Sequence, residues 1–162
     1  MQIDHLLRHP QHVDFVAELV FTEFWAGVEG GYTRARLAAA FGGKTRPSPV
    51  LLSLIALEGE RPLGCVHLID NDDASLPELH PWLAAMVVVP QRRGQGIGST
   101  LVRALAGEAR LLGFDQLWFG TDGPGFYERL GARKHLQRGP AFWIMRLALD
   151  RPPADGGPSR AG

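Results

Sequence analysis

The apolar residues of this chain recur with two periods, about 3.6 residues in some segments and two in others. Residues 11–26 predict an amphipathic helix, because their apolar positions recur every three or four residues. The stripe consists of Val13, Val16, Ala17, Val20 and Phe24. Further apolar side chains lie off this stripe, so we expect the helix to be buried on several sides or to form the wall of a groove. A second helix is expected over 33–41, where Thr33 can cap the first turn.

Short apolar runs bounded by glycine and proline predict strands. The most apolar run, Leu83–Val89, is expected to be the central strand, and a helical pattern after it continues to about Leu112. A turn over 58–62, which holds a glycine and a proline, joins two of the strands into a hairpin. The other expected strands are residues 2–7, 50–57, 63–69, 116–120, 132–136 and 142–149.

Length and composition indicate one compact domain without nucleic-acid or membrane partners. The chain has 162 residues, which suits one hydrophobic core, so we expect a single domain over 1–150. Residues 151–162 contain no large apolar side chain and are expected to be disordered. Seventeen basic and seventeen acidic residues give a net charge of zero, so nothing global attracts nucleic acid or an acidic membrane.

The chain is predicted to be cytoplasmic. Its N-terminus lacks the basic start and the apolar run of a signal peptide, and no apolar run reaches the ~20 residues of a membrane helix. Cys65 is the only cysteine, which excludes an intramolecular disulfide and suits a reducing compartment. His5, His9 and His12 are spaced like metal ligands. Pro10 interrupts any helix that would align them, so we predict no metal site.

A glycine-rich turn after the central strand indicates where a ligand binds. Its sequence is Gln91-Arg92-Arg93-Gly94-Gln95-Gly96-Ile97-Gly98-Ser99. A strand that leads into such a turn and then into a helix leaves several backbone N–H groups unpaired and directed at one place, which is an anion-binding arrangement. Pro90 ends the strand, and the glycines let a ligand approach the backbone without a Cβ in the way. We therefore expect a phosphorylated ligand here.

The turn fits one phosphate-binding signature better than two others. It lacks the Gly-Lys-Ser/Thr of a lysine-bearing nucleotide loop, and it matches the dinucleotide fingerprint Gly-x-Gly-x-x-Gly poorly. Residues Gln91 to Gly96 instead match Gln/Arg-x-x-Gly-x-Gly/Ala. Farther along the chain, residues 124–132 match a second motif, Phe-Tyr-x-Arg/Lys-Leu-Gly-Phe/Ala. With both motifs in this order, the chain resembles the GCN5-related N-acetyltransferase (GNAT) superfamily.

The resemblance implies an α/β fold and a cofactor, acetyl-coenzyme A (acetyl-CoA). The superfamily has a mixed, mostly antiparallel sheet flanked by helices, and the pantetheine arm enters where two parallel central strands splay apart. Main-chain groups of Met86 and Val88 would bind the pantetheine, and the turn from Arg93 to Ser99 would hold the pyrophosphate. Gly120 departs from the pattern, because relatives usually have a cofactor-binding asparagine there. The implied cofactor site consists of Met86, Val88, Arg93, Gly94, Gln95, Gly96, Ile97, Gly98, Ser99 and Phe126.

The implied reaction is acetyl transfer from acetyl-CoA to an amine. The tyrosine of the second motif, here Tyr127, commonly protonates the departing thiolate in this superfamily; its alternative role is packing against the cofactor. A phenol with an ordinary pKa of ~10 is protonated at neutral pH, and this pKa is close to that of a thiol, ~8.5. The main-chain N–H of Val88 would stabilise the tetrahedral oxyanion.

The base that takes the proton from the amine is less apparent. Many relatives carry a glutamate on the central strand, but residues 82–89 hold no titratable side chain. We take His80 as the first candidate, because the ordinary pKa of histidine lies near neutral pH; a solvated loop histidine is its other interpretation. The alternatives are Glu78, Glu29, Asp70 or Asp72 acting through water, or a water chain without any single base.

Acidic and aromatic residues indicate a small cationic amine as the acceptor. Negative charge comes from Glu29 and from the acidic loop that holds Asp70, Asp72, Asp73 and Glu78. Three aromatic rings offer flat surfaces. The expected substrate site consists of Trp25, Glu29, Tyr32, Asp72 and Trp82. A peptide or protein N-terminal acetyltransferase and a non-catalytic acyl-CoA binding module are the rival functions. The sequence does not decide the oligomeric state, and a homodimer is compatible with it.

Overall fold

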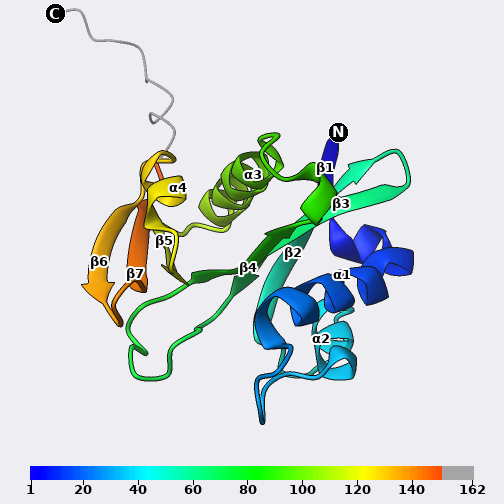
Figure 1. Ribbon diagram of the computed structural model, residues 1–162, viewed down its shortest axis with the longest axis horizontal. Coiled ribbons are helices and arrows are strands. Elements are labelled where there is room, and N and C mark those ends of the chain that lie inside the picture. The colour runs from blue at the N-terminus through cyan, green and yellow to red at the C-terminus, as the bar shows by residue number, and fades with distance from the viewer. Residues whose placement is uncertain (151–162) are drawn as a thin grey trace, which may run out of the picture.

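Seven strands form one mixed sheet in the order β1-β2-β3-β4-β5-β7-β6 (Figure 1). The computed structural model describes residues 1–150, and the tail that we expect to be disordered, 151–162, lies outside them. The strands are β1 (Gln2–His5), β2 (Val50–Glu58), β3 (Arg61–Ile69), β4 (Trp82–Val88), β5 (Gln116–Thr121), β6 (Arg133–Gln137) and β7 (Trp143–Ala148). The predicted α/β class and mixed sheet are confirmed.

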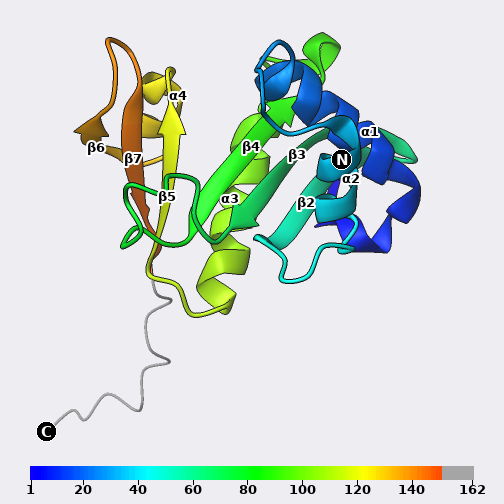
Figure 2. The ribbon, with the colours of Figure 1, turned by 90° about the horizontal axis from the view of Figure 1, so that it is seen from below.

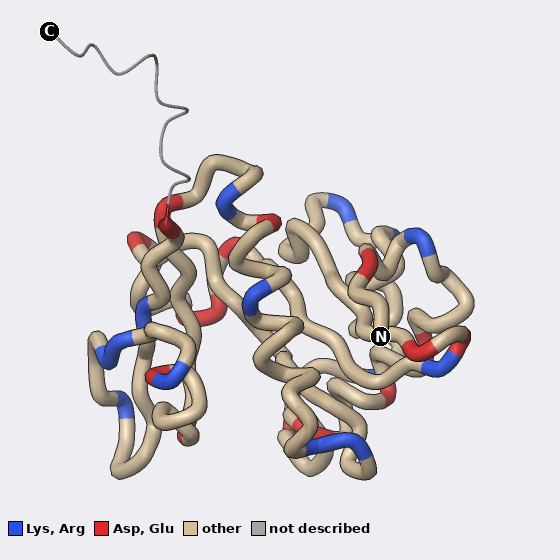
Figure 3. Tube along the Cα trace, turned by 90° about the horizontal axis from the view of Figure 1, so that it is seen from above, with Lys and Arg blue, Asp and Glu red and all other residues tan. Residues whose placement is uncertain are grey.

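Helices cover both faces of the sheet (Figure 2). They are α1 (Val13–Val20), α2 (Arg34–Phe41), α3 (Ile97–Leu111) and α4 (Pro124–Glu128), with short 3-10 turns at Leu6–Arg8, Pro10–His12 and Pro90–Arg92. The first two helices pack on one face and α3 packs on the other. No helix within the described 150 residues combines the length and the apolarity needed to cross a membrane. Basic and acidic residues are distributed over both halves of the molecule (Figure 3).

The predicted helix over 11–26 is not one regular helix. After α1 the chain continues as a π-helical turn, Phe21–Trp25, which is closed by a bond of 2.9 Å from the Ala26 N–H to the Phe21 carbonyl. Such turns occur frequently at functional sites. This one carries Glu23, Phe24 and Trp25 to the cavities described below.

The alternation of side chains along the strands divides the core into two layers. In β2, Leu54 packs in the layer beneath α3 and Ile55 packs in the layer beneath α1 and α2, because successive side chains point to opposite faces. Leu101 and Leu105 of α3 and Val16 of α1 are almost fully buried in these layers. Both faces of the central strands are therefore covered.

A β-bulge interrupts β4 where the two central strands begin to separate. Ala85 and Met86 stand opposite a single residue of β3, between the residues that pair with Cys65 and His67. Ala85 has a positive φ of 51°. A bulge bends its strand and changes the direction of its side chains. Met86 consequently lines both cavities of the candidate site.

β4 and β5 are parallel neighbours that separate after one pair of residues, Trp82 with Trp118 (Figures 1 and 2). Near its C-terminal end, β4 remains bonded to β3, where the Val89 N–H donates to the Leu63 carbonyl at 2.9 Å. Main-chain groups of an antiparallel strand alternate in direction. The N–H and C=O of Val88 therefore point away from β3, into the opening between β4 and β5.

Candidate active site

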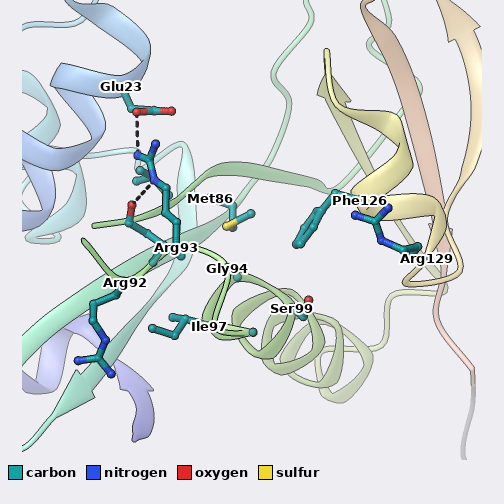
Figure 4. A pocket seen from close by; sticks show the side chains of 13 residues that line it. Glu23, Met86, Arg92, Arg93, Gly94, Ile97, Ser99, Phe126 and Arg129 are labelled. Carbon is teal, nitrogen blue, oxygen red and sulfur yellow. Dashed lines mark hydrogen bonds and ion pairs between the residues drawn. The ribbon is translucent and has the colours of Figure 1, made fainter. Parts of the chain in front are cut away.

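A cavity of about 520 Å³ lies between the end of β4, the first turn of α3 and α4 (Figure 4). All the residues predicted to bind the cofactor line it except Gln95. They are Met86, Val88, Arg93, Gly94, Gly96, Ile97, Gly98, Ser99 and Phe126. The Gln95 side chain instead accepts a hydrogen bond of 3.0 Å from the Arg92 Nε. We call this space the cofactor cavity.

The first turn of α3 supplies unpaired N–H groups to this cavity. The first bond of the helical ladder runs from the Thr100 N–H to the Gly96 carbonyl at 3.1 Å, so the three preceding amides, of residues 97–99, have no partner inside the helix. Gly94 and Gly96 have φ values of 76° and 82°. A Cβ at either glycine would meet no atom within 4 Å, so the left-handed backbone is what requires glycine there.

Two arginines approach the cofactor cavity from opposite sides, Arg93 beside β4 and Arg129 next to α4 (Figure 4). The Arg93 Nε donates to the Val88 carbonyl at 2.9 Å, and its Nη2 lies 3.2 Å from the Glu23 carboxylate. Arg129 and Glu23 were not among the predicted site residues. Arg129 lies within the second motif, which is the sequence signal that could have identified it.

A second cavity of about 520 Å³ lies on the face of the sheet that α1 and α2 cover. It shares Glu23 and Met86 with the cofactor cavity, so the two spaces meet beside the bulge of β4. Its lining, all within the described residues, contains three carboxylates and neither lysine nor arginine. The carboxylates are Glu23, Asp72 and Asp122, and the aromatic residues are Phe24, Trp25, Tyr32, Phe41, Tyr127 and Phe142. We call this space the acceptor cavity.

Three of the five residues predicted to bind the substrate, Trp25, Tyr32 and Asp72, line the acceptor cavity. The rings of Trp25 and Tyr32 meet edge to face, with centroids 5.1 Å apart. Trp82 does not contribute to either cavity, because it is buried in the core and donates its Nε1–H to the Leu79 carbonyl at 2.6 Å. Glu29 also lines neither cavity and is exposed after the π-helical turn. The structure therefore does not bring these two residues together with the other three.

His80, the predicted base, lies outside both cavities. Its Nδ1 is 2.7 Å from the Asp70 carboxylate, and its ring lies against Phe114 with centroids 5.2 Å apart. The residue precedes the first residue of β4, whereas the cavities meet beside the bulge farther along that strand. The structure therefore does not bring His80 to the cavities, and its role as the base stays a prediction.

Tyr127 lines the acceptor cavity, and its neighbour Phe126 lines the cofactor cavity. The Tyr127 ring packs against Phe126 and Phe119, with centroids 4.9 Å and 4.4 Å away. Burial raises the pKa of Tyr127 to about 12. The phenol is therefore protonated at neutral pH, but its pKa is farther from that of a thiol, ~8.5, than an ordinary phenol's would be. This arrangement suits a hydrogen-bond donor better than a full proton donor.

A loop between β3 and β4 carries Asp72 to the acceptor cavity. Asn71 organises the loop by donating from its Nδ2 to the carbonyls of Leu76 and Leu79 at 3.0 Å and 3.2 Å. Although Asp72 is an exposed residue, desolvation of its carboxyl group, followed by the negative charge of Asp73, raises its pKa to about 6. Asp72 is thus a carboxylate at neutral pH with a stronger affinity for protons than an ordinary aspartate.

Sequence reasoning also missed Phe142 and His67 as lining residues of the acceptor cavity. The Phe142 ring lies against Gly120, where a Cβ would come within 2.4 Å of the ring. This contact accounts for the glycine that replaces the family's asparagine. His67 interrupts an otherwise apolar stretch of β3, and that polar residue was the available signal. Nothing in the pattern of residues around Phe142 indicated its role.

Residues 17–132 match the acetyltransferase (GNAT) family, and no curated protein matches the chain. Among solved structures, the chain is similar to an aminoglycoside 6'-N-acetyltransferase complexed with coenzyme A, with a TM-score of 0.72 and 19% identity over 95% of this chain and 100% of the other. For PaiA N-acetyltransferase from Thermoplasma acidophilum, in complex with coenzyme A, the TM-score is 0.64 and the identity is 16% over 91% of this chain and 99% of the other. For Ard1 from Thermoplasma volcanium, the TM-score is 0.65 and the identity is 14% over 93% of this chain and 98% of the other.

At these identities the likeness to solved structures supports the fold. The family match is the stronger finding, because it extends from α1 through the glycine-rich turn to the end of the second motif. The chain therefore belongs to the acetyltransferase (GNAT) family and is an N-acetyltransferase that takes acetyl-CoA as its cosubstrate.

Proposed function

We propose that the protein acetylates a primary amine of a small cationic molecule. The observation that carries this proposal is the contrast in charge between the two cavities. Arg93 and Arg129 line the cofactor cavity from opposite sides, which suits the phosphates of acetyl-CoA. The acceptor cavity has two carboxylates of its own, Asp72 and Asp122, shares Glu23, which is paired with Arg93, and has neither lysine nor arginine among its described lining residues. This lining suits a protonated amine.

Acetyl transfer would occur by direct attack in a ternary complex, since the two cavities meet at Glu23 and Met86. The ammonium ion first loses a proton, and the free amine nitrogen then forms a bond to the thioester carbonyl carbon. The carbon–sulfur bond breaks, the nitrogen loses a second proton, and the departing thiolate takes up a proton to become the thiol of CoA. We assign the Val88 N–H to the oxyanion, because it points into the opening between β4 and β5. We assign the Tyr127 phenol to the departing thiolate as a hydrogen-bond donor.

We propose Asp72 as the group that holds the ammonium ion and receives its proton, directly or through water. Asp72 lines the acceptor cavity, and desolvation raises its pKa to about 6. This pKa is closer to neutral pH than that of an ordinary aspartate, so the carboxylate is a better proton acceptor. Glu23, where the two cavities meet, is the second carboxylate that a water chain could reach. His80 is not proposed again, because it lines neither cavity.

An amine screen read by thiol release, followed by substitution of Asp72, tests this function. For the best cationic amine we expect Asp72→Asn to raise KM about tenfold or more, with an unchanged Kd for CoA, since a charge-assisted bond to the amine is lost. Asp70→Asn is the matched control, because Asp70 lies on the same loop and lines neither cavity. KM should also rise with salt.

Three outcomes would overturn the proposal. If neutral or acidic amines are the best substrates and their KM does not depend on salt, the acceptor is not recognised as a cation. If peptide N-termini are the best substrates, the protein is a peptide N-terminal acetyltransferase. If CoA binds but no amine or peptide releases thiol, the chain is an acyl-CoA binding module. Calorimetric titration of CoA separates this last case from a misfolded sample.

A further inference from the structure

His67 combines almost complete burial with an unpaired nitrogen beside the acceptor cavity. It is 1% exposed, lines that cavity, and has no hydrogen-bond partner for its Nε2 among the described residues. An unsatisfied buried polar atom is unfavourable by an amount comparable to a lost hydrogen bond. A buried histidine of this kind therefore needs an explanation.

The rest of the His67 ring is held firmly. Its Nδ1 shares a hydrogen bond of 2.6 Å with the Ser53 Oγ, directly across the β2–β3 ladder. Phe41 of α2 stacks on the ring face, with centroids 4.0 Å apart and planes inclined by 11°. These two contacts fix the ring plane and use one nitrogen, so Nε2, at the far end of the ring from the strand, is the atom without a partner. Because Nε2 is now covered, a ligand that pairs with it must displace the side chains between it and the cavity.

The chemistry of the missing partner follows from the charge of the ring. Burial lowers the pKa of His67 to about 3, so the ring is neutral, with one nitrogen protonated and one bare. If Ser53 donates to Nδ1, Nε2 carries the proton and donates; if Nδ1 donates to Ser53, Nε2 accepts. A hydroxyl group satisfies either form, because it can both donate and accept. A second ammonium group would satisfy only the accepting form.

We propose that His67 is a specificity-determining residue that pairs through Nε2 with a hydroxyl group of the acceptor, at a position separate from the amine that is acetylated. This inference rests on the proposed function of the acceptor cavity. Asp72 and His67 line the same cavity, so the acceptor would be an amino alcohol whose charged end binds the carboxylate and whose hydroxyl reaches the buried ring. Selectivity arises because an acceptor without the hydroxyl leaves Nε2 unpaired.

The test compares pairs of primary amines that differ by one hydroxyl, such as cyclohexylamine with the aminocyclohexanol isomers. Two readouts are taken: the ratio of kcat/KM within a pair, and the ratio of amine Kd values for the CoA-saturated protein by calorimetry. In the wild type, one isomer of a pair should be favoured about tenfold or more. In His67→Phe, which keeps the ring stacked on Phe41, the ratio should fall to about one.

Two further variants and one control make the result decisive. His67→Gln places an amide near the position of Nε2 and should restore part of the preference, while Ser53→Ala removes the tether and should reduce it even if His67→Phe does not fold. His12→Phe is the control, because His12 also has a buried Nε2 without a partner but lines neither cavity. The ratio should be unchanged in that variant.

The inference is overturned if no hydroxyl position gives a preference in the wild type, which is the result expected if water pairs with Nε2. It is also overturned if His67→Phe keeps the preference. Selective binding in the calorimeter without thiol release would contradict the proposed acetylation and leave the role of His67 supported. Acetylation without selectivity would contradict the role of His67 alone. An absence of amine binding would contradict both.

Discussion

Desolvation of the titratable group gives two residues of the acceptor cavity different protonation states. Desolvation raises the pKa of Tyr127 to about 12, which keeps the phenol neutral over the whole physiological range. It raises the pKa of Asp72 to about 6, which keeps the carboxylate charged at neutral pH and more basic than usual. One environment would therefore provide, in the mechanism we propose, a donor for the departing thiolate and an acceptor for a proton of the amine.

The role of Tyr127 is tested by removing its hydroxyl group. Tyr127→Phe should lower kcat by about 10²–10³, the usual effect of losing one donor to a developing negative charge, with an unchanged Kd for CoA. Because the phenol has a pKa of about 12, the wild-type kcat should show no decline from this group up to about pH 10. Steady-state rates against pH provide the measurement. A nearly normal kcat in the variant would identify Tyr127 as a packing residue.

Arg93 should contribute to the affinity for the cofactor. It lines the cofactor cavity beside the unpaired amides of α3, so Arg93→Gln should weaken CoA binding about 10- to 100-fold, the range expected for a lost charge-assisted hydrogen bond. The effect should shrink as salt is added. Arg103→Gln is the matched control, because Arg103 is exposed on α3 and lines neither cavity. Equal affinities of the two variants, measured by calorimetry, would contradict the assignment.

At the scale of elements, replacing two glycines by alanine should change stability in opposite directions, one through helix propensity and the other through close packing. Gly107 lies inside α3, where a Cβ would meet no atom within 4 Å, so Gly107→Ala should raise the free energy of unfolding by about 0.5–1 kcal/mol. At Gly64 of β3, a Cβ would come within 2.7 Å of the Val87 carbonyl oxygen. Gly64→Ala should therefore lower the free energy of unfolding by about 1–3 kcal/mol. Urea unfolding measures both. A destabilised Gly107→Ala variant would show that α3 has less room than the geometry indicates.

The elements that sequence analysis located are those specified by local patterns. The strands, the glycine-rich turn and α3 follow from apolar periodicity, glycine and proline. The bulge at Ala85 and the π-helical turn after α1 could not be predicted, because they depend on how β4 meets β3 and on how the end of α1 meets the cavities. Those irregular elements direct Met86 and Glu23, which is why sequence analysis missed Glu23.

The same limit explains which site residues were predicted. The cofactor site is nearly contiguous in sequence, and all its predicted residues except Gln95 line one cavity. The acceptor cavity draws residues from α1, α2, β3, β4, β5 and the loops, so its composition depends on tertiary structure. Trp82 was predicted for its flat ring and His80 for its pKa and its place near the start of the central strand. Whether either side chain reaches a cavity depends on its direction and on which end of the strand it lies at, which sequence does not give.

At the scale of the whole molecule, the splayed sheet separates two charges and brings two ligands together. The first turn of α3 and the arginines lie on the side of the opening that suits phosphates, and the carboxylates lie around the acceptor cavity on the other face. With a net charge of zero, the molecule as a whole attracts neither ligand. Local charge at each cavity therefore has to supply the selectivity for each substrate.

The stability of the molecule should depend on pH through His67. Its folded pKa of about 3 lies below the ordinary value of 6.5, so between these values the unfolded chain binds a proton that the folded chain excludes. The free energy of unfolding should be highest above pH 6.5 and decrease by up to roughly 1.4 kcal/mol per pH unit on acidification toward pH 3. His67→Gln should remove this slope.

Asp72 should act in the opposite direction. Its folded pKa of about 6 lies above the ordinary 3.8, so the folded chain retains a proton that the unfolded chain releases, and this contribution to stability is lost as the pH rises from 3.8 to 6. Because Asp72 is exposed and screened by solvent, its effect should only partly offset that of His67. Asp72→Asn should therefore steepen the loss of stability between pH 6 and 4, in urea unfolding at several pH values, while His67→Gln should flatten or reverse it. Parallel profiles for the wild type and both variants would mean that neither group titrates differently in the folded and unfolded chains.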